Sequence, residues 1–522
     1  MLGEEHYQLG TRYDTDREIS FITTLNYDKS FSDIHNITAL GGFQQETSKF
    51  QRLDASKEGL PSNELHEIGA GSVNPTAGGS TVNYGLQSFF GRVTYNFKEK
   101  YLFEANVRYD GSSNFAEGKK WGVFPSFSAG WNIDKESFFN DIDFIDNLKL
   151  RGSWGKLGNQ AIAPNQYSPR YALGQNYSYG GQLVGGAAQT VLPNPEITWE
   201  TSTQTDIGLD LRAFSGKLGF VFDYYHKVTD DILRPINVSG VVGGLQAPTV
   251  NLASVENKGL EFALSHRNVI GEFSYNVDAN LTTINNEVIK LDAPSIGGIS
   301  WLAEGRPIDE FYTIKMLGIF QNQQEINEHG AQPSAQPGDI KFQDLNNDGE
   351  INDEDRQPIA SSIPKYTYGL NLSAEYKGFD LSVLFQGVEG NHAITEEEQK
   401  PFFNNAGLPK FWVDNAWTSE NPNNKYPRLV RGSNYINNVW RNSSFLVEDA
   451  SYLRLKNFQI GYTLPSMITE RINIKRLRVY MNAQNPLTFT SYRGLDPEKN
   501  PFQIRGSYSN VQTYSLGLNL SL

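Results

Sequence analysis

The sequence of 522 residues predicts an all-β protein, a transmembrane antiparallel β-barrel with short periplasmic turns and long extracellular loops. Three observations carry this prediction: apolar and polar residues alternate through runs of about ten, short and long connections alternate along the chain, and 12% of the residues are aromatic. A barrel strand exposes only every second side chain to lipid, so the mean hydropathy stays low, as it does here at −0.48. The aromatic residues would form girdles at the two membrane interfaces.

The clearest strands lie between residues 88 and 132. From Tyr101 to Asp110 nearly every second residue is apolar, which is the period of a strand with one lipid-facing and one wet face. The run from Phe89 to Phe97 has the same period and is separated from the first by Lys98-Glu99-Lys100, so a tight hairpin turn is expected. A polar loop then leads to a third alternating run, from Val123 to Trp131.

The same period predicts the remaining strands in chain order. We expect them at residues 18–29, 35–49, 148–154, 203–213, 218–228, 260–270, 273–282, 366–376, 379–387, 451–462, 475–489 and 508–522. Long polar loops are expected at residues 50–80, 158–196, 229–250, 287–362 and 389–449, and the residues up to Arg17 are expected to end another loop. The connection from Asp134 to Asp146 is expected to hold one helical turn.

The alternation of connections also assigns a side to each of them. Short turns of outer-membrane barrels face the periplasm and long loops face outside, so the last strand is expected to run inward. The count is about 15 strands, beginning outside the cell and ending in the periplasm. A barrel ordinarily has an even number of strands and both ends in the periplasm, so we expect upstream strands to be missing from this chain.

Composition argues against several other classes of protein. No run of 18 apolar residues occurs, so neither a transmembrane helix nor a secretory signal is expected. The sequence has no cysteine for disulfides or thiolate metal sites, and its net charge of −14 argues against a nucleic-acid partner. The seven histidines are scattered, without an HExxH or GxSxG motif, so we predict no catalytic residues and no enzyme activity.

The strongest chemical motif is the loop from Asp344 to Asp355. Its spacing places Gly349 where a calcium loop turns most sharply, and it places oxygen donors at the ligand positions of such a loop. The predicted ligands are Asp344, Asn346, Asp348, Glu350 through its carbonyl, Asn352 and Asp355. Asp355 stands where glutamate is more usual, as in dockerin-type loops, and its shorter arm is expected to weaken binding. The Ca²⁺ would pin the loop; the alternative is a polar turn without an ion.

Aromatic residues of the long loops are candidates for contact with a substrate or with a partner that covers the loops. Their flat apolar faces and polar edges suit stacking on sugar rings or seating of peptide side chains. The candidates are Trp301, Trp412, Trp417, Tyr435 and Trp440. The alternative for each is a structural role, packing within the loops or lining the edge of the bilayer.

Several segments together resemble a known family. They are FFGRVTYNF (89–97), KYLFEANVRYDGSSNF (100–115), WGVFPSFSAGW (121–131), LKLRGSWGKLGNQ (148–160), NPEITWETSTQTDIGLDL (194–211) and PGDIKFQDLNNDGEINDEDR (337–356). In these segments the chain resembles the SusC/RagA-type TonB-dependent outer-membrane transporters, and the likeness runs from about Tyr27 to the C-terminus.

The resemblance implies both an architecture and a function. The family barrel has 22 strands, of which residues 1–522 would supply roughly the last 15, while the plug, the N-terminal domains and about seven strands would be absent. It implies import of oligosaccharides or peptides across the outer membrane. The implied partners are a SusD-like surface lipoprotein and, through the missing N-terminal part, the TonB complex.

Two other functions stay open at this point. A calcium-stabilised surface adhesion or glycan-binding protein built from β-sandwich repeats would show strands of about five or six residues and no alternation of short and long connections. A passive porin would share the barrel, and the sequence upstream of Met1 would decide between porin and transporter because only the transporter needs a plug and a TonB-contacting segment.

Overall fold

The structure is a computed structural model. It describes residues 7–522 except 33, 237, 240, 242, 396–401, 404–409, 424, 432–441, 473 and 503–507. Two compact units make up the chain. Unit 1 comprises Met1–Trp131, Arg151–Thr205 and Val228–Ser254, and unit 2 comprises Asn132–Leu150, Asp206–Lys227 and Val255–Leu522.

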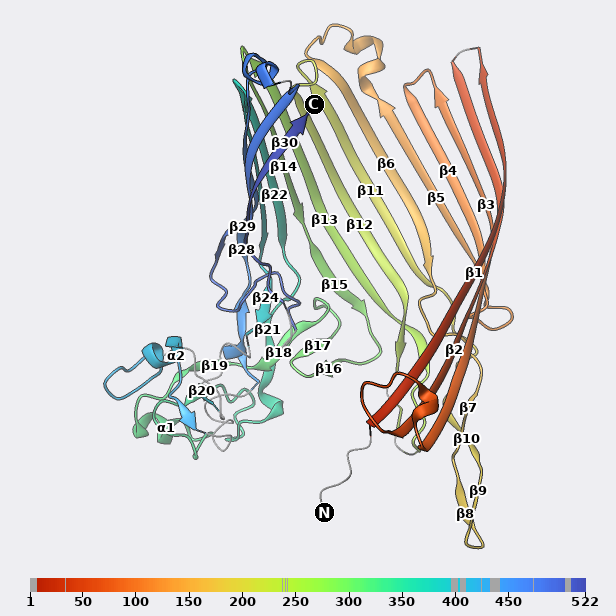
Figure 1. The fold of residues 1–522 in the computed structure, drawn as a ribbon, viewed down its shortest axis with the longest axis vertical. Coiled ribbons are helices and arrows are strands. Elements are labelled where there is room, and N and C mark those ends of the chain that lie inside the picture. The colour runs from red at the N-terminus through yellow and green to blue at the C-terminus, as the bar shows by residue number, and fades with distance from the viewer. Residues whose placement is uncertain are drawn as a thin grey trace. The chain divides into compact units, whose positions relative to one another are not determined.

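Sixteen of the strands formed by the described residues belong to one sheet; fifteen of them follow one another in chain order, and β15 pairs with β13 off this path (Figure 1). They are β1 (Tyr7–Phe31), β2 (His35–Leu60), β3 (Val73–Phe97), β4 (Tyr101–Ser112), β5 (Trp121–Asn132), β6 (Ile145–Asn159), β11 (Glu200–Ala213), β12 (Leu218–Pro235), β13 (Thr249–Ile270), β14 (Phe273–Thr283), β15 (Asn285–Lys290), β22 (Tyr366–Tyr376), β23 (Phe379–Glu389), β28 (Tyr452–Thr463), β29 (Arg476–Thr490) and β30 (Thr513–Ser521). Successive pairs such as β1–β2 and β22–β23 are antiparallel. The predicted fold class is thereby confirmed.

The hairpin between β3 and β4 has the turn that the sequence predicts. Lys98 and Glu99 both adopt positive φ, 54° and 57°, which is the geometry of a two-residue type I′ turn. The backbone N–H of Lys100 donates to the carbonyl of Phe97 over 2.9 Å. The side chain of Asn96 accepts from the N–H of Glu99 over 2.8 Å and so supports a turn that lacks glycine.

In unit 1 the register gathers apolar side chains on one face, which we call the outer face. Tyr95, Phe103 and Ala129 lie in one row across β3, β4 and β5. The side chain of Phe103 is 56% exposed and that of Val123 is 55% exposed. Large apolar groups left open to this extent on a paired sheet are expected where lipid covers the surface.

Aromatic side chains border the outer face at two heights. Ring contacts of 4.6 to 6.4 Å link Phe21, Phe43, Phe89, Trp121 and Tyr109, a set that we call the long-loop girdle. At the short-turn end, Phe97 stacks on Tyr101 with 6.2 Å between the ring centres. At about 3.3 Å per residue and a strand tilt of about 40°, the eight steps from Tyr101 to Tyr109 span about 20 Å along the membrane normal. The apolar band of outer-membrane barrels is about 25 Å tall, so the distance between the two aromatic borders agrees with the thickness of such a band.

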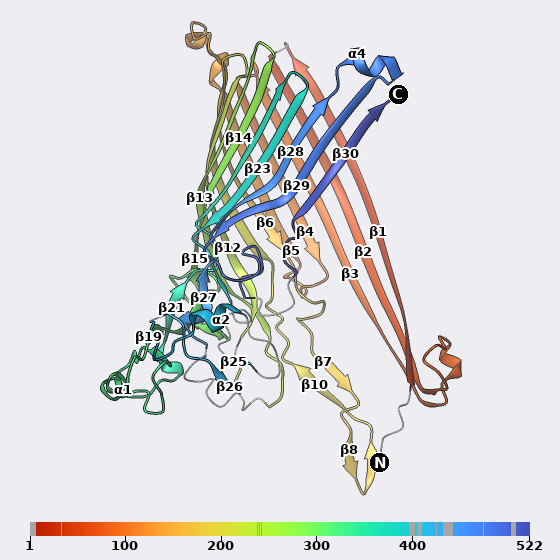
Figure 2. The ribbon, with the colours of Figure 1, turned by 60° about the vertical axis from the view of Figure 1, so that its left-hand side comes forward.

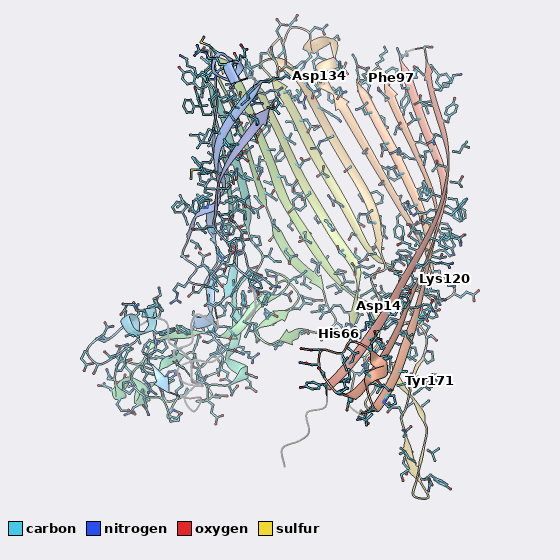
Figure 3. All side chains as sticks on the ribbon, in the orientation of Figure 1. Asp14, His66, Phe97, Lys120, Asp134 and Tyr171 are labelled. Carbon is cyan, nitrogen blue, oxygen red and sulfur yellow. The ribbon has the colours of Figure 1, made fainter. Side chains whose placement is uncertain are left out.

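The first three strands are longer than the sequence predicts. The loop expected at residues 50–80 is wrong for most of its length, because β2 continues to Leu60 and β3 begins at Val73, and β1 already begins at Tyr7. Figure 3 labels Asp14 in this long extension and Phe97 at the opposite, short-turn end. Apolar side chains such as Tyr13 and Leu53 are scattered among polar ones in the extension, so the regular lipid-facing period is missing. Cross-strand ion pairs hold it instead, with Arg12–Asp54 at 2.6 Å and Arg52–Asp14 at 2.9 Å.

Smaller differences concern other connections. The expected loop at residues 158–196 contains two paired hairpin segments, β7 (Arg170–Leu173) with β10 (Ala187–Val191) and β8 (Tyr177–Tyr179) with β9 (Gln182–Val184). β12 and β13 also extend into the expected loop at residues 229–250, and β30 starts at Thr513, later than predicted. The helical turn expected near residues 134–146 is confirmed as two short 3₁₀ turns, Ile133–Lys135 and Ser137–Phe139.

The long connections of unit 2 fold into small sheets and short helices (Figure 2). The strands are β16 (Ser295–Gly297), β17 (Ser300–Leu302), β18 (Glu310–Ile314), β19 (Met316–Ile319), β20 (Ile340–Phe342), β21 (Arg356–Ala360), β24 (His392–Ile394), β25 (Phe402–Phe403), β26 (Val430–Arg431) and β27 (Val447–Asp449). The helices are α1 (Gln323–His329), α2 (Lys410–Asn415) and α4 (Ser466–Thr469). Within the part of the chain that the structure describes, no helix is long and apolar enough to cross a membrane.

Candidate functional site

Two long loops of unit 2, one between β14 and β22 and one between β23 and β28, share an apolar core. Its buried members, which we call the loop core, are Ile314, Ile319, Ile340, Phe342, Ile394, Trp412, Ala416, Phe445 and Leu446. Figure 2 shows α1, α2, β19 and β27, which come from these two loops, gathered at one end of unit 2. Because the core draws residues from both loops, the two segments fold as one body rather than as separate polar loops.

A buried ion pair reinforces the loop core. The guanidinium of Arg428 donates to Asp339 over 2.6 Å, and the Asp339 side chain is 0% exposed. Burial raises the pKa of Asp339, although the hydrogen bonds from Arg428 and from the N–H of Gln336 favour its ionised form. Removing Arg428 alone would leave this carboxylate buried without its counter-ion, which is far costlier than removing an exposed pair.

The last long loop, between β29 and β30, is fixed to β28 by a second charged group. Arg454 is 4% exposed and pairs with Asp496 at 2.8 Å and with Glu498 at 3.0 Å. Lys456 also pairs with Glu498, at 2.9 Å. Burial opposes ionisation of Asp496, but hydrogen bonds from the N–H of Asn510 and from Arg454 outweigh it and hold the pKa of Asp496 below its usual range.

A cavity of about 310 Å³ lies between the loop core and the last loop, all within unit 2. Its lining includes Lys425, Ser444, Phe445, Glu448, Ser491 and Arg493. The Nε of Arg493 donates to Glu448 over 2.6 Å, and its guanidinium lies 4.9 Å from the ring centre of Tyr426. The cavity therefore offers hydrogen-bond donors and acceptors in a fixed arrangement, which suits hydroxyl or amide groups of a small ligand.

The loop from Asp344 to Asp355 adopts the turns of a calcium loop. Gly349 has a φ of +86°, and its N–H donates to Asp344 over 2.9 Å. The side chain of Asn346 accepts from the N–H of Asp348 over 3.1 Å, and the side chain of Asp348 accepts from the N–H of Glu350 over 2.8 Å. The hydrogen bond from Glu350 is the main reason that the pKa of Asp348 lies below its usual value, so this carboxylate stays ionised.

The surroundings of Asp344 and Asp355, at the two ends of the loop, show whether the loop could bind a metal ion. Asp355 is 0% exposed and closes the loop by accepting from the N–H groups of Leu345 and Asn352, over 2.7 and 2.8 Å. The Oδ1 of Asp344 is buried and has no hydrogen-bond partner among the described residues. No three acidic or histidine side chains in the described ranges gather as a ready-made metal site. The donor set, carboxylate and amide oxygens with one unsatisfied buried oxygen, fits a hard cation such as Ca²⁺.

The candidate aromatic residues have different environments. Trp412 is 0% exposed inside the loop core, so its surface supports the core and is closed to a ligand in this structure. Trp301 stacks on Tyr312, with 4.2 Å between ring centres, and remains partly exposed. Trp417 packs on the loop core and donates from its indole to Gln321 over 2.9 Å. Tyr435 and Trp440 lie outside the residues that the structure describes.

Unit 1 contains a second apolar core that the sequence analysis missed. It consists of Phe115, Phe124, Ile197 and Trp199. The indole N–H of Trp199 donates to the carbonyl of Lys120 over 2.9 Å, so the start of β11 holds the connection between β4 and β5 (Figure 3 labels Lys120). The available signal was a lone tryptophan directly before an alternating strand, in a segment already quoted for its family likeness.

Comparison with known proteins identifies the family. The family model described as "TonB dependent receptor-like, beta-barrel" matches residues 3–485. The chain belongs to the TonB-dependent receptor family. It is 34% identical to TonB-dependent receptor P3 of Formosa agariphila, over 95% of this chain and 51% of that protein. It is 28% identical to TonB-dependent receptor SusC of Bacteroides thetaiotaomicron, over 83% of this chain and 43% of that protein.

Solved structures place the fold within the same family. The RagAB peptide transporter matches with a TM-score of 0.82 and 25% identity, over 98% of this chain and 56% of the compared chain. The chain is thus a SusC/RagA-type β-barrel of the outer membrane, as the sequence analysis expected. It spans about half the length of the curated relatives it matches. The β-sandwich adhesion alternative is overturned by the single large sheet.

Proposed function

We propose that the protein carrying this chain imports oligosaccharide or peptide nutrients across the outer membrane, with a SusD-like lipoprotein as its surface partner. The proposal rests on the likeness to SusC and to a chain of the RagAB peptide transporter. Energy would come from the TonB complex, acting through parts of the protein outside this chain.

The structural observation that carries the proposal is the loop core with its adjacent cavity. A transporter that must capture a scarce nutrient gains affinity when the contacting loops are already ordered, because less conformational entropy is lost on binding. Buried Trp412 and the Asp339–Arg428 pair provide this order. The cavity beside Lys425 and Arg493 is then a preformed site for the polar groups of the nutrient.

Nutrient uptake by the host bacterium tests the function. A strain lacking the gene should lose growth on one class of oligosaccharide or peptide as sole source, and the intact gene should restore it. Import should also stop when the proton gradient is collapsed, since a passive porin would continue to admit the nutrient. Unchanged growth of the deletion strain on every oligosaccharide and peptide tested would refute the proposal.

A variant of Lys425 tests the cavity separately. Lys425 is exposed, so Lys425→Ala should leave the fold intact while removing one charged donor, and binding of the identified nutrient should weaken about fivefold. Lys410→Ala is the matched control because Lys410 lies on α2, 86% exposed and outside the cavity lining. Equal affinities of the two variants for the nutrient would mean that the cavity is not part of the binding site. The import proposal would be unaffected.

We propose in addition that the loop from Asp344 to Asp355 binds Ca²⁺. The unsatisfied Oδ1 of Asp344 and the ionised Asp348 favour this over an ion-free turn. The ion would hold the loop next to β20 and β21 and perform no chemistry. Its ligands would be those named from the sequence, with Asp355 fixed by Leu345 and Asn352 as a backbone clamp.

Proteolysis of the intact protein tests the ion. Calcium at about 100 times its dissociation constant should slow cleavage near Asn347 about 100-fold, because the bound ion stabilises the closed loop. Asp348→Ala should abolish this protection. Asp353→Ala should retain it, since Asp353 is 79% exposed, pairs with Arg356 and occupies no ligand position. Equal cleavage in calcium and in chelator would leave only the ion-free turn.

A further inference from the structure

The loop from Asp344 to Asp355 connects two short strands of unit 2, β20 and β21. β20 ends at Phe342, just before the loop, and β21 begins at Arg356, just after it. β20 pairs with β19, and β21 pairs with β18 (Figure 1). Since β18 and β19 follow each other directly in the chain, the two strands that flank the loop both pair with one segment, residues 310–319. A closed loop therefore holds this segment through both of its strands.

Two residues of this segment connect the loop to the cavity of about 310 Å³. Met316 lines the cavity and stands opposite Phe342 in the β19–β20 register. The N–H of Gln343, directly before the loop, donates to the carbonyl of Lys315 over 2.9 Å. The N–H of Met316 donates to the hydroxyl of Ser444 over 2.9 Å, and Ser444 also belongs to the cavity lining. Two hydrogen bonds therefore link the start of the loop to the cavity wall.

The other end of the loop leads to the same stretch of wall. Arg356 stands opposite Ile314 in the β18–β21 register, and Ile314 is a 1% exposed member of the loop core. Ile314 also forms a parallel bridge with Ser443. The hydroxyl of Thr313 donates to the carbonyl of Asn442 over 2.5 Å. Residues 442 and 443 directly precede the cavity-lining residues 444 and 445, so both ends of the loop contact this wall through residues 310–319.

The charge of the loop makes its closure depend on a cation. Six of the twelve residues from Asp344 to Asp355 are acidic and none is basic. Repulsion between carboxylates so close together favours an open loop, and a bound divalent cation offsets it. In the closed loop Ile351 packs on the loop core, and the side-chain amide of Gln357 donates to that of Gln343 over 3.1 Å. An open loop would lose these contacts, so an ion shifts the loop between two arrangements.

We propose that calcium bound in this loop fixes the cavity wall at Met316 and Ser444 and thereby strengthens capture of the nutrient. This inference rests on the proposed calcium site and on the proposed role of the cavity, and it adds an energetic link between the two. With the ion bound, the wall is already ordered when the nutrient arrives, so less conformational entropy is lost on binding. Thermodynamic linkage requires that the nutrient strengthen calcium binding by the same factor. Nutrient capture would thus depend on the calcium concentration outside the cell.

The reactivity of a cysteine in the cavity wall tests this link with calcium alone as the probe. The chain has no cysteine, and Met316→Cys in the intact protein keeps the backbone N–H that donates to Ser444. Saturating calcium should slow modification of this thiol by a soluble maleimide about tenfold, measured by mass spectrometry of its peptide. Adding Asp348→Ala should remove the calcium effect. The matched control is Leu317→Cys, 52% exposed and outside the cavity lining, which should react at the same rate with and without calcium.

Calcium affinity of a cavity variant tests the link from the other side. Ser444→Ala removes the acceptor of the Met316 N–H without touching a predicted calcium ligand. Because the wall and the loop close together, calorimetry on the intact protein should show calcium binding about fivefold weaker. Ser444→Thr keeps the hydroxyl and should restore the affinity. Ser491→Ala is the matched control, since Ser491 lines the cavity from the last loop, and it should bind calcium as the wild type does.

The outcomes separate this inference from the proposals on which it rests. Calcium protection near Asn347 with unchanged reactivity of Met316→Cys would overturn the link and leave the calcium site in place. Equal calcium affinity of wild type and Ser444→Ala would also overturn it. No calcium effect at either position would overturn the calcium site and the link together, while growth of the deletion strain would still decide the import proposal. Gel migration with and without boiling verifies that every variant is folded.

Discussion

Replacing Trp412 with alanine should open the loop core while leaving the large sheet folded. The indole is 0% exposed and lies among the rings of Phe411, Tyr426 and Phe445, with centres 5.6 to 6.3 Å away. Truncating a fully buried aromatic residue to alanine costs about 3–5 kcal/mol. The sheet has its own hydrogen-bond ladder and does not depend on this core, so the loss should fall on local opening of the loops.

The expected loss of stability is large enough to be measured by limited proteolysis. At about 1.4 kcal/mol per factor of ten, Trp412→Ala should raise the open population of the loops by roughly 100-fold to 4,000-fold. Limited proteolysis of the intact protein should show loop cleavage faster by that factor, while unboiled protein keeps its folded-barrel migration on a gel.

Val413→Ala provides the matched control, because Val413 is the next residue of α2 and is 67% exposed. It should be cleaved at the wild-type rate. Equal cleavage of the Trp412 and Val413 variants would mean that the loop core does not hold the loops. Loss of the folded-barrel band in Trp412→Ala would mean that loops and sheet unfold as one cooperative body.

Three further outcomes are expected. On whole cells expressing the intact protein, Lys98→Cys should resist a membrane-impermeant thiol reagent and Gly349→Cys should react; the reverse pattern would invert the assigned sides. Gly461→Ala should destabilise the barrel by about 1–3 kcal/mol in heat-modifiability gels. The reason is that the added Cβ would lie 2.6 Å from both Asp380 Oδ1 and Arg478 Nε. The control Gly41→Ala, whose Cβ would have no atom within 4 Å, should have little effect. Equal melting temperatures of the two variants would show that the Asp380–Arg478 ion pair moves aside without a cost in stability. Burial lowers the pKa of His392 below the ordinary histidine value of about 6.5. The unfolded loops therefore bind the proton more readily, and stability is lost as the pH falls from about 6.5 through the folded-state pKa. Proteolysis of the loops should become faster as the pH falls. If the His392→Gln variant shows the same acceleration, a titratable group other than His392 causes the effect.

The sequence predicts the membrane-spanning part of this fold well because lipid imposes a strict period there. The alternation from Tyr101 to Asp110 and the turn at Lys98 both follow from the sequence alone and are confirmed in the structure. The extension of β2 and β3 could not be predicted in the same way. Cross-strand pairs such as Arg52–Asp14 stand there in place of a regular apolar period, and such pairs are not recognisable without the register.

The candidate site is predicted only where its residues are close in sequence. The spacing from Asp344 to Asp355 indicates a calcium loop, and the predicted turn at Gly349 is present, while the ion itself stays a prediction. Burial of Trp412 results from contact between two loops distant in sequence, and the same holds for the Asp339–Arg428 pair. Neither carries a local signal, so sequence alone could not separate a core tryptophan from a ligand-contacting one.

The loop core has a consequence for how this receptor could be re-engineered or could diversify. Its buried members all lie between Ile314 and Leu446, on loops inserted beside the consecutive sheet neighbours β14, β22, β23 and β28. Residues 284–451 therefore form a cassette that could be exchanged between relatives as one segment, without altering the ten strands of the large sheet that precede it, β1 to β6 and β11 to β14. The seam of such a chimera would include Tyr492 and Arg493, which contact Ile394 and Glu448 from outside the cassette. It would also include Phe502, which packs on Phe311, and Asn257, which accepts from Asn286. Donor and recipient that match at these four positions should yield folded hybrids with exchanged recognition, and mismatched pairs should not.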